Sequence, residues 1–430
     1  MNRLTITIIT IAVSFLYVLS GAAVAMTLDV NSIAEITTDV NHQVFGYEQT
    51  FAVSGDVSVW LDNRDPCWIP RIYGVNLSDV NHLEFVVDLN APSCDRLAMS
   101  GHLVVYPVQE QSGPQYLRVA DITNQSNPSI FNVTLPIPYI NLVDISGSMI
   151  AYSGSEPNNN YQDTIYAADV TDPCSIQQYI ISALPANCSV RGLAIDGSYI
   201  SWSVENYDGD DYVQIADITS PNEPDVLTAQ LPASITFENI DASEQWLVAH
   251  GRDDWQYRIF AVQNYQDTNN WDIQVLWRDG ENGEYFVSGP RIDGPITVWV
   301  ASTWMPSLGE GPAPLSDYDY MLKASYLRGN GGFTLSTLLV DTNNLRAADI
   351  WGSQVVWSKM ATVTDLFKAS IELECGDWGY KRADLNYDCK VDFEDFATFA
   401  EDWLKCTTPG GQDCGFGLLS GGTSSHGRPD

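Results

Sequence analysis

The sequence predicts an all-β fold, a seven-bladed β-propeller, followed by a small α-helical calcium-binding module. A short motif recurs along the chain: a tight turn ending in Gly, then alternating apolar residues, then an aromatic residue. Its six clear copies and one degenerate copy lie 46 to 58 residues apart, about the length of a four-stranded blade. Val, Ile, Thr, Tyr and Trp are abundant, and these residue types favour β-strands.

The first 25 residues are expected to be a secretory signal peptide. Arg3 is the only charge, an apolar run follows, and Ala23-Val24-Ala25 forms a small-residue cleavage pattern. An uncleaved membrane anchor is the alternative, because the apolar run is long for a signal peptide. We expect the mature chain to be secreted, either extracellular or at the cell surface, with the periplasm as a further location and no membrane span after cleavage.

The charge balance bounds the classes of partner. The 430 residues include 20 Lys and Arg against 55 Asp and Glu, a formal net charge of −35. Nucleic-acid binding through a basic surface is therefore not expected, since neutralising phosphates requires clustered cations. With 45% hydrophobic residues and only 17% charged ones, the composition is that of a folded protein rather than a disordered one.

The repeats predict the propeller over residues 26–374. The turn residue of the motif stands at positions 55, 101, 147, 197, 244, 294 and 352, and the copy around 244 (SEQWLVA) is the degenerate one. A second motif of the type IYGVNL (72–77) follows each turn, so each unit contains about four strands that bury their faces against neighbouring units. Aromatic residues five positions after the turn are expected to pack between blades: Trp60, Tyr106, Tyr152, Trp202, Trp299 and Trp357.

The pattern in 53–77 resembles the TolB-type propeller repeats of exported surface proteins, over about 320 residues. The resemblance implies the fold and leaves function open, because propellers serve as enzymes, scaffolds and binding platforms. The last repeat ends at its third strand. We therefore expect the run near 33–38 to supply the missing outermost strand by pairing near 366–372.

An acidic segment after the propeller predicts a calcium site within a module at 375–414. Residues 384–395 read DLNYDCKVDFED, which matches the oxygen-ligand spacing of an EF-hand loop, and an apolar helical face follows. A solvated acidic turn without metal is the alternative. The expected ligands, with the Lys390 carbonyl and with Asp392 direct or through water, are Asp384, Asn386, Asp388, Lys390, Asp392 and Asp395.

The loop ends in Asp rather than Glu and begins within Ala-Asp-Leu-Asn (383–386), and in both respects it resembles a dockerin type I repeat. That resemblance implies calcium as cofactor and a cohesin-like partner. The sequence departs from the family in two ways: Cys389 stands where Gly is usual, and there is one loop instead of two. A module that only stabilises the C-terminus is the alternative to cohesin recognition. Residues 415–430 are expected to be a flexible tail.

The eight cysteines of an exported chain are expected to form disulfides. Cys67 and Cys94 follow the second and fourth strands of a blade, at the same end of it. Cys174–Cys188 requires a short or bent strand between the two residues. The four expected pairs are Cys67–Cys94, Cys174–Cys188, Cys375–Cys389 and Cys406–Cys414.

The sequence contains no G-x-S-x-G, H-E-x-x-H or P-loop motif. This favours an exported non-catalytic binding or scaffold protein, a recognition platform for a protein or polysaccharide, with carbohydrate-related biology suggested only by analogy. An extracellular polysaccharide-degrading enzyme, a glycoside hydrolase or lyase with an acidic pocket, is the alternative. His250 with Arg252 and Asp253 could serve acid–base or metal chemistry, or form an ordinary polar loop.

One long insertion, 301–320, is rich in Gly and Pro and contains several aromatic residues. Such loops carry function more often than the scaffold beneath them. We expect it to form one wall of a ligand pocket, at the end of the propeller that bears the loops between second and third strands. A neutral insertion is the alternative. The candidate ligand contacts are Arg64, Trp68, His250, Asp253 and Trp304.

Overall fold

The structure is a computed structural model, and the residues it describes are 25–29, 32–37, 49–64, 70–92, 94–109, 113–135, 139–155, 163–253, 256–280, 284–286, 288–304, 318–328, 332–341, 344–360 and 364–374. The chain divides into a unit Met26–Glu372 and a second unit formed by the two ends. Only the first is described below. The predicted calcium ligands, the four C-terminal cysteines and most of the signal peptide lie outside the described residues. Within the described part, no helix has the length and apolarity to cross a membrane.

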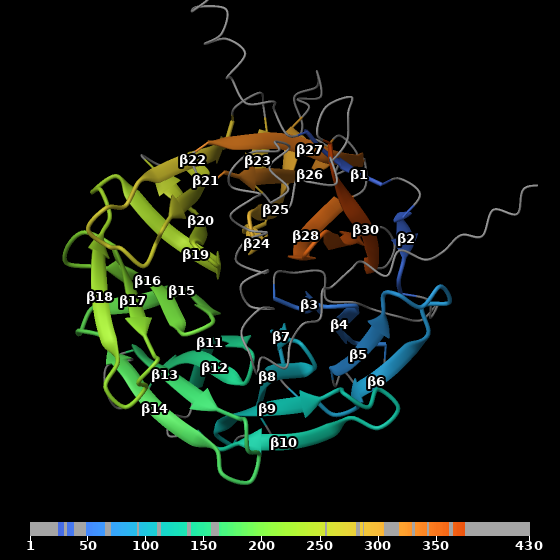
Figure 1. Ribbon diagram of the computed structural model, residues 1–430, viewed down its shortest axis with the longest axis horizontal. Helices are drawn as coiled ribbons and strands as arrows, with labels where there is room; N and C mark the ends of the chain where they lie inside the picture. The colour runs from blue at the N-terminus through green and yellow to red at the C-terminus, as the bar shows by residue number, and fades with distance from the viewer. Residues whose placement is uncertain are drawn as a thin grey trace, which may run out of the picture. The chain divides into compact units, whose positions relative to one another are not determined.

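Seven antiparallel sheets form a ring, so the seven-bladed prediction is confirmed (Figure 1). Blades 1 to 3 consist of β3 (Phe51–Ser54), β4 (Val57–Asp62), β5 (Arg71–Asn76) and β6 (Glu84–Asp88); β7 (Ala98–Ser100), β8 (Leu103–Gln109), β9 (Gln115–Asp121) and β10 (Ser129–Val133); and β11 (Tyr139–Ser146), β12 (Met149–Ser155), β13 (Asp163–Asp169) and β14 (Gln177–Ala183). Blades 4 and 5 consist of β15 (Cys188–Asp196), β16 (Tyr199–Asn206), β17 (Tyr212–Asp217) and β18 (Asp225–Gln230); and β19 (Ile235–Ser243), β20 (Trp246–Asp253), β21 (Gln256–Gln263) and β22 (Ile273–Arg278).

Blades 6 and 7 depart slightly from this plan. In blade 6 the innermost strand is split into two pieces, and in blade 7 the outermost strand comes from the N-terminal part of the chain. The strands are β23 (Glu284–Phe286), β24 (Arg291–Asp293), β25 (Ile296–Trp304), β26 (Tyr318–Leu327) and β27 (Phe333–Asp341); and β28 (Asn344–Trp351), β29 (Gln354–Met360), β30 (Thr364–Glu374), β1 (Ala25–Leu28) and β2 (Ala34–Glu35).

The recurring Gly forms the two-residue turn between the first and second strands of each blade. In six blades this Gly has a φ between 53° and 58°, which L-residues with a side chain rarely adopt. In blade 5, Glu244 takes the same conformation with a φ of 55°. The degenerate copy of the motif therefore keeps the turn geometry although it has lost the Gly.

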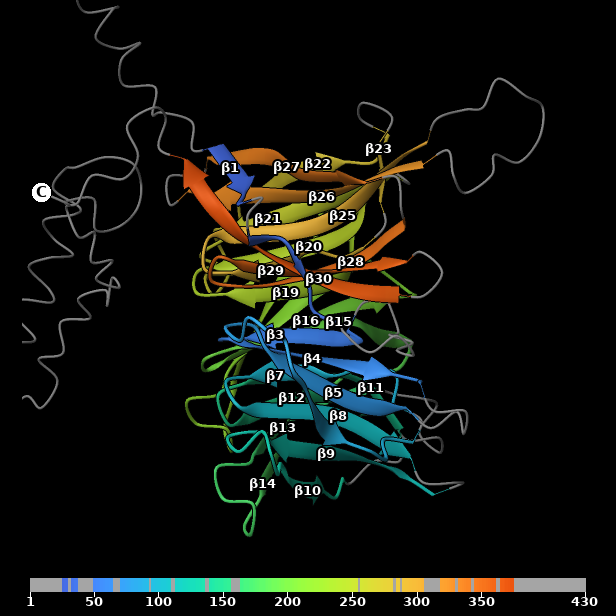
Figure 2. The same ribbon diagram turned by 90° about the vertical axis from the view of Figure 1, so that its right-hand side faces the viewer.

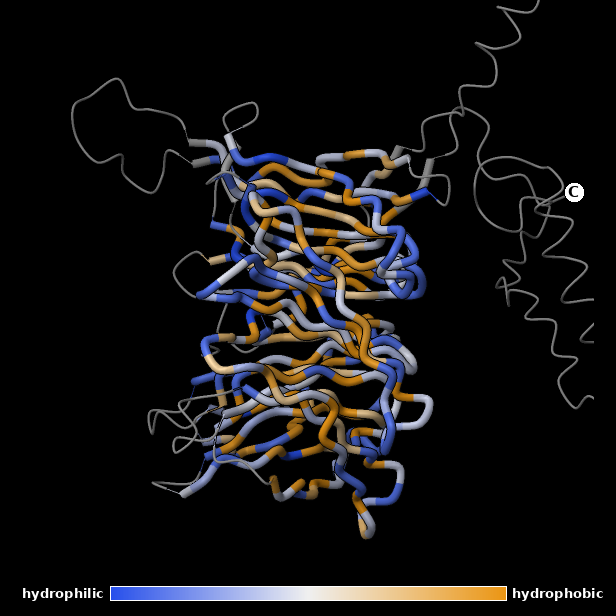
Figure 3. Tube along the Cα trace, turned by 90° about the vertical axis from the view of Figure 1, so that its left-hand side faces the viewer, coloured by the Kyte–Doolittle hydropathy of each residue, from blue (hydrophilic) through white to orange (hydrophobic). Residues whose placement is uncertain are grey.

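The aromatic residues after the turns are buried, as predicted. Trp60, Tyr106, Tyr152, Trp202, Trp299 and Trp357 are all at most 1% exposed. Hydrophobic clusters join neighbouring blades; one, for example, contains Ala194 and Val213 of blade 4 with Phe237 and Phe260 of blade 5. Figure 3 shows hydrophobic segments running along the strands and hydrophilic ones gathered at the strand ends. The core therefore lies between the blades, which is why the ring must be complete to bury it.

The N-terminal segment completes blade 7, as predicted. Ala34 and Glu35 of β2 pair with Lys368 and Phe367 of β30, and β1 pairs with another part of β30 (Figure 2). The Ile36 N–H donates to the Leu366 carbonyl at 2.9 Å, and the Ile36 side chain is completely buried. The two ends of the propeller sequence thus close the ring through one shared sheet.

The residue before each turn links its blade to the next. Its side-chain oxygen accepts a hydrogen bond from the backbone N–H of the turn residue one blade on, at the six junctions from blade 1 to blade 7. The pairs are Ser54 with Gly101, Ser100 with Gly147, Ser146 with Gly197, Asp196 with Glu244, Ser243 with Gly294, and Asp293 with Gly352. At the closing junction Trp351 stands in this position, and an indole has no acceptor oxygen.

The predicted Cys174–Cys188 disulfide is absent, because both residues are free thiols. Cys174 precedes β14 and Cys188 begins β15, so the seven-residue β14 lies between them. A strand of that length separates its ends by roughly 20 Å, far beyond disulfide reach. Cys94 is also a free, buried thiol whose pKa is raised by that burial. Its predicted partner Cys67 lies outside the described residues.

Candidate functional site

Four innermost strands contain a β-bulge, always six residues before the turn residue. The register shifts identify Asn141 in β11, Arg191 in β15, Glu238 in β19 and Arg346 in β28 as the extra residues. A bulge leaves one residue unpaired and turns its side chain away from the regular alternation. These side chains lie toward the end of the propeller opposite the Gly turns, where each innermost strand begins.

Blades 4 and 5 pair their bulge residue with a charged residue of the second strand. In blade 4, Arg191 Nε donates to Glu205 Oε2 at 2.6 Å. In blade 5, Arg252 Nε lies 2.8 Å from Glu238 Oε1. Glu205 and Arg252 both stand eight residues after their turn residue. The two blades therefore form the same ion pair with the arginine and the glutamate exchanged.

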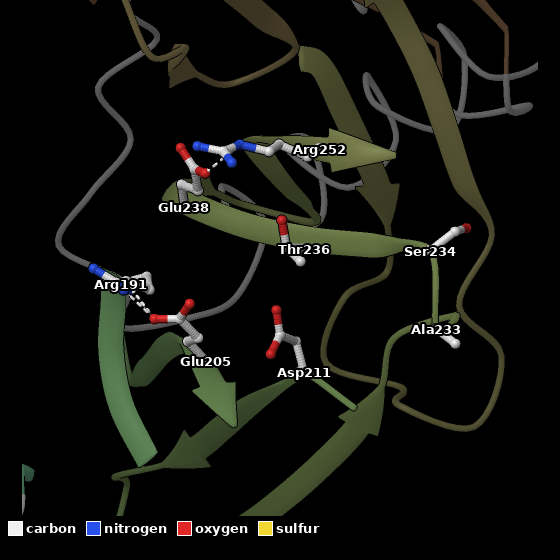
Figure 4. A pocket seen from close by; sticks show the side chains of 8 residues that line it. All are labelled: Arg191, Glu205, Asp211, Ala233, Ser234, Thr236, Glu238 and Arg252. Carbon is white, nitrogen blue, oxygen red and sulfur yellow. Dashed lines mark hydrogen bonds and ion pairs between the residues drawn. The ribbon is translucent and has the colours of Figure 1, made fainter. Parts of the chain in front are cut away.

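These two ion pairs lie on facing walls of a cavity of about 680 Å³ between blades 4 and 5 (Figure 4). Asp211, just before β17, completes the blade 4 wall. The other wall comes from β19, β20 and the residues before β19. The lining residues are Arg191, Glu205, Asp211, Ala233, Ser234, Thr236, Glu238 and Arg252. The cavity therefore presents both hydrogen-bond donors with positive charge and acceptors with negative charge.

Two glycines allow the strands beside this cavity to approach closely. A Cβ on Gly192, the residue after the Arg191 bulge, would lie 2.7 Å from the backbone nitrogen of Ile240 in blade 5. A Cβ on Gly251 would lie 1.8 Å from the carbonyl oxygen of Thr236. Any side chain at either position would push β19 away. Both glycines therefore fix where Thr236 and Glu238 stand.

Burial and neighbouring charges decide the protonation of the cavity. Burial acts to lower the pKa of Arg191, but the hydrogen bonds and charge of Glu205, with the further charge of Glu238, outweigh it and raise that pKa. Burial, followed by the charge of Arg252, lowers the pKa of His250 to about 3. His250 is therefore neutral, and it stacks on Tyr257 with ring centroids 5.1 Å apart.

A second cavity, of about 210 Å³, lies in the central channel near the Gly turns. Its charged residues include Asp144, Asp241 and Asp349, each three residues before a turn residue. Each of these carboxylates accepts two backbone N–H groups, one from its own strand and one from the next blade, at 2.9 to 3.0 Å. These carboxylates are already bonded to backbone N–H groups, and they serve to link blades. The larger cavity is therefore the better candidate for a ligand site.

Three of the predicted ligand contacts, Arg64, His250 and Asp253, are described, and they do not gather in one pocket. In blade 1, Arg64 is held by Asp62 and by Glu84, with Nη1 2.8 Å from Glu84 Oε2, and its guanidinium lies over the Tyr73 ring. In blade 5, Asp253 pairs with Arg258 at 2.6 Å. Of these three described residues, His250 alone approaches the larger cavity: its Nδ1 lies 4.0 Å from Oε2 of the lining residue Glu238.

The predicted pocket wall also lies largely outside the structural description. Trp68, the side chain of Trp304 and residues 305–317 are not among the described residues. Trp304 pairs with Tyr318 at the base of this loop, where β25 and β26 meet.

Four lining residues were not predicted from the sequence as site residues: Arg191, Glu205, Glu238 and Asp211. The sequence does distinguish three of them, because they stand six residues before or eight residues after a turn residue. Only blades 4 and 5 have charged residues at both of these positions. Blade 2, for comparison, has Asp95 and Gln109 at these positions, and blade 7 has Arg346 and Met360. Asp211 lies in a loop of variable length, so the repeat offers no such alignment for it.

No protein-family model matches the chain, and no curated protein sequence matches it. Solved structures do resemble it. The β-propeller domain of the trilobed protease from Pyrococcus furiosus, described as having an open velcro topology, aligns with a TM-score of 0.51 and 12% identity, covering 76% of this chain and 97% of that one. A structure from a study of two prolyl endopeptidases aligns with a TM-score of 0.50 and 14% identity, and an acylaminoacyl peptidase complex with 0.50 and 10%.

The chain spans about half the length of these two peptidases, because the alignments cover 46% and 52% of their residues. The same alignments cover 74% and 76% of this chain. At these identities the likeness shows the β-propeller fold. It also corrects the expected function: the three similar structures come from a protease and from peptidases, so the non-catalytic scaffold with a carbohydrate connection gains no support from them. A polysaccharide lyase also matches, with a TM-score of 0.45.

Proposed function

We propose that this chain takes part in peptide hydrolysis by holding a peptide substrate in the cavity between blades 4 and 5. The observation that carries the proposal is the pair of oppositely oriented ion pairs, Arg191–Glu205 and Glu238–Arg252, on the two walls of that cavity. A volume of about 680 Å³ is within the usual range of ligand pockets, roughly 300 to 1,000 Å³.

A peptide matches this chemistry better than a uniformly charged ligand does. Its backbone offers donors and acceptors at short intervals, and its side chains and ends carry both signs of charge. Each arginine still has N–H groups beyond those directed at its carboxylate, and these suit a carbonyl or carboxylate of a peptide. Ser234 and Thr236 add hydroxyl groups that can both donate and accept.

The fold likeness supports the same direction. The matched part of the Pyrococcus furiosus protease is its propeller domain, almost over its full length, and the other two structures come from peptidases. We assign the peptide-holding role to the cavity because only blades 4 and 5 have charged residues both six positions before and eight positions after the turn residue.

Fluorescence anisotropy of the full chain with the labelled peptide Ac-AKAAAEAA-amide tests this proposal. Arg252→Ala should weaken binding by about tenfold or more, because a charge-assisted hydrogen bond contributes about 1.5–3 kcal/mol. The matched control is Arg346→Ala, the bulge arginine of blade 7 outside the cavity, which should bind as the wild type does. Mass spectrometry of the same samples reports any peptide cleavage. Absence of peptide binding, or equal effects of the two variants, would overturn the proposal.

A further inference from the structure

We infer that the cavity between blades 4 and 5 selects peptides with a basic side chain, and that Asp211 is the residue that selects them. This inference rests on the proposed function, since it names the substrate class of the same cavity. The observation behind it is the balance of charged side chains that line the cavity. The cavity contains two arginines and three carboxylates, so one negative charge is left over.

The excess charge belongs to Asp211. Glu205 is bonded to Arg191, and Glu238 is paired with Arg252. Asp211 lies in the electrostatic field of Arg191 and Glu205, but it forms no ion pair with any residue in the part of the chain that the structure describes. An incoming ammonium or guanidinium group would therefore meet one carboxylate whose charge is not already offset by a bonded cation.

The backbone around Asp211 holds this carboxylate in place. Asp211 Oδ1 accepts a hydrogen bond from the Asn206 N–H at 3.0 Å, and the Asp211 carbonyl accepts one from the Leu231 N–H at 3.2 Å. Figure 4 shows the carboxylate directed into the cavity, toward the wall that bears Thr236. A half-buried and fixed carboxylate loses little freedom when it binds a cation, which favours selectivity.

Burial adds a reason for a cation to bind. It raises the pKa of Asp211, with a further rise from the charge of Glu205, since a carboxylate is poorly solvated there. An organic cation offsets that cost. A metal ion fits less well, because it requires several oxygens at once, and no group of three His, Cys, Asp or Glu suited to a metal occurs among the described residues.

The charge near Asp211 and on the whole chain also favours basic peptides. Asp208 and Asp210, in the same loop as Asp211, are exposed, and the whole chain carries a net charge of −35. Such a field attracts positively charged ligands and accelerates their association. The exposed Asp210 is a matched control for Asp211, since the two residues are adjacent and only Asp211 lines the cavity.

The test measures the affinity of the full chain for three labelled peptides, Ac-AAKAA-amide, Ac-AAEAA-amide and the norleucine analogue of the first. The wild type should bind the lysine peptide at least tenfold more tightly than either of the others. Asp211→Asn should abolish that preference, so that the lysine peptide and its norleucine analogue bind with equal affinity. Asp210→Asn should retain it. A preference that survives Asp211→Asn would overturn the inference.

The same measurements separate the two proposals. If the wild type binds all three peptides equally, the selectivity is wrong and the peptide-holding role stands. If it binds none of them but binds n-butylammonium in an Asp211-dependent manner, the cation site stands and the peptide role is wrong. If neither the peptides nor n-butylammonium bind, both are wrong. Circular dichroism of each variant checks that the propeller remains folded.

Discussion

The role of a single residue in this protein follows from the number of positions that separate it from the turn residue of its blade. One position before it lies the oxygen that links neighbouring blades, as in Ser54 with Gly101. Three positions before it lie the channel residues, which include Asp144 and Asp241. Six positions before it lie the bulge residues, which include Arg191. The groups that link blades therefore stand one and three positions before the turn residue, and two residues of the candidate site stand six positions before it.

The turn of blade 5 offers a test at this scale. Glu244 has a positive φ that a residue with a side chain adopts at a cost of roughly 1–2 kcal/mol. Its backbone N–H bond to Asp196 would survive a change to Gly. Glu244→Gly should therefore raise the free energy of unfolding by about 1 kcal/mol. Urea denaturation measures this change.

Gly147→Glu is the reverse substitution in blade 3. A Cβ at Gly147 meets no atom within 4 Å, so any loss of stability comes from the backbone conformation rather than from a clash. We expect a loss of about 1 kcal/mol. If Glu244→Gly destabilises the protein, or if Gly147→Glu leaves it unchanged, this account of the turns is wrong.

The channel carboxylates predict how stability depends on pH. Burial raises the pKa of Asp144 to about 6 and that of Asp241 to about 7, against a partial opposing effect of Arg291 on Asp241. In the unfolded chain both groups would lose their proton near pH 4. Between pH 4 and 7 the folded state therefore holds more protons, and its stability falls as the pH rises.

Urea denaturation of the wild type at pH 5 and pH 8 should show greater stability at pH 5. Asp241→Asn should reduce the difference, because the asparagine retains an acceptor oxygen and does not titrate. The charged groups that face Asp241 in the channel, Arg291, Asp144 and Asp349, remain in this variant. Asp225→Asn, on the exposed outer strand of blade 4, should leave the difference unchanged. Equal pH dependence in all three proteins would contradict the prediction.

At the scale of elements, the N-terminal strands decide whether the ring is complete. β2 pairs with β30 for only two residues, yet the segment after it reaches the interior between blades 7 and 1. Ile36 packs there in one cluster with Phe51, Trp60 and Leu366. At the junction between blades 7 and 1 the side-chain-to-turn hydrogen bond is missing, because the indole of Trp351 has no acceptor oxygen. The stability of this junction therefore depends on this packing and on the bond from the Val53 N–H to Asp349.

Ile36→Ala tests the contribution of this segment. The side chain is completely buried, so its removal should cost about 2–4 kcal/mol. Ile33→Ala removes the same atoms from a side chain that is 38% exposed, and it should cost less than about 0.5 kcal/mol. Thermal unfolding of both variants provides the comparison. Similar melting temperatures would show that closure does not depend on Ile36.

At the scale of the whole molecule, the propeller uses one repeated plan, and the ion pairs of the candidate site are additions to this plan in two blades. Six of the seven junctions share the same side-chain-to-turn hydrogen bond, and the seventh is closed by the N-terminal segment. Blades 4 and 5 follow this plan as well, and they also carry the ion pairs of the cavity. Scaffold and candidate site therefore use different positions of the same repeat.

The calcium module also belongs to this scale, and it stays a prediction. Isothermal titration of the full chain with calcium should show one site, and Asp384→Ala should remove most of the affinity because it deletes one of the few charged ligands. Asp413→Ala, outside the expected loop, is the control. Uptake that is unchanged by Asp384→Ala would refute the ligand assignment.

The sequence by itself determined the all-β class, the number of blades, the buried aromatic positions and the closing strand. Each follows from a local pattern that repeats, since Gly selects the turn and alternation selects the strand. Only the tertiary structure decided which side chains meet between blades. Arg191 and Glu238 are 47 residues apart and share a cavity because two bulges and two close-packed glycines place them there. Arg64 and His250 were expected in one pocket, yet the ring places them in separate blades, because angular position in a propeller depends on the blade and not on the residue type.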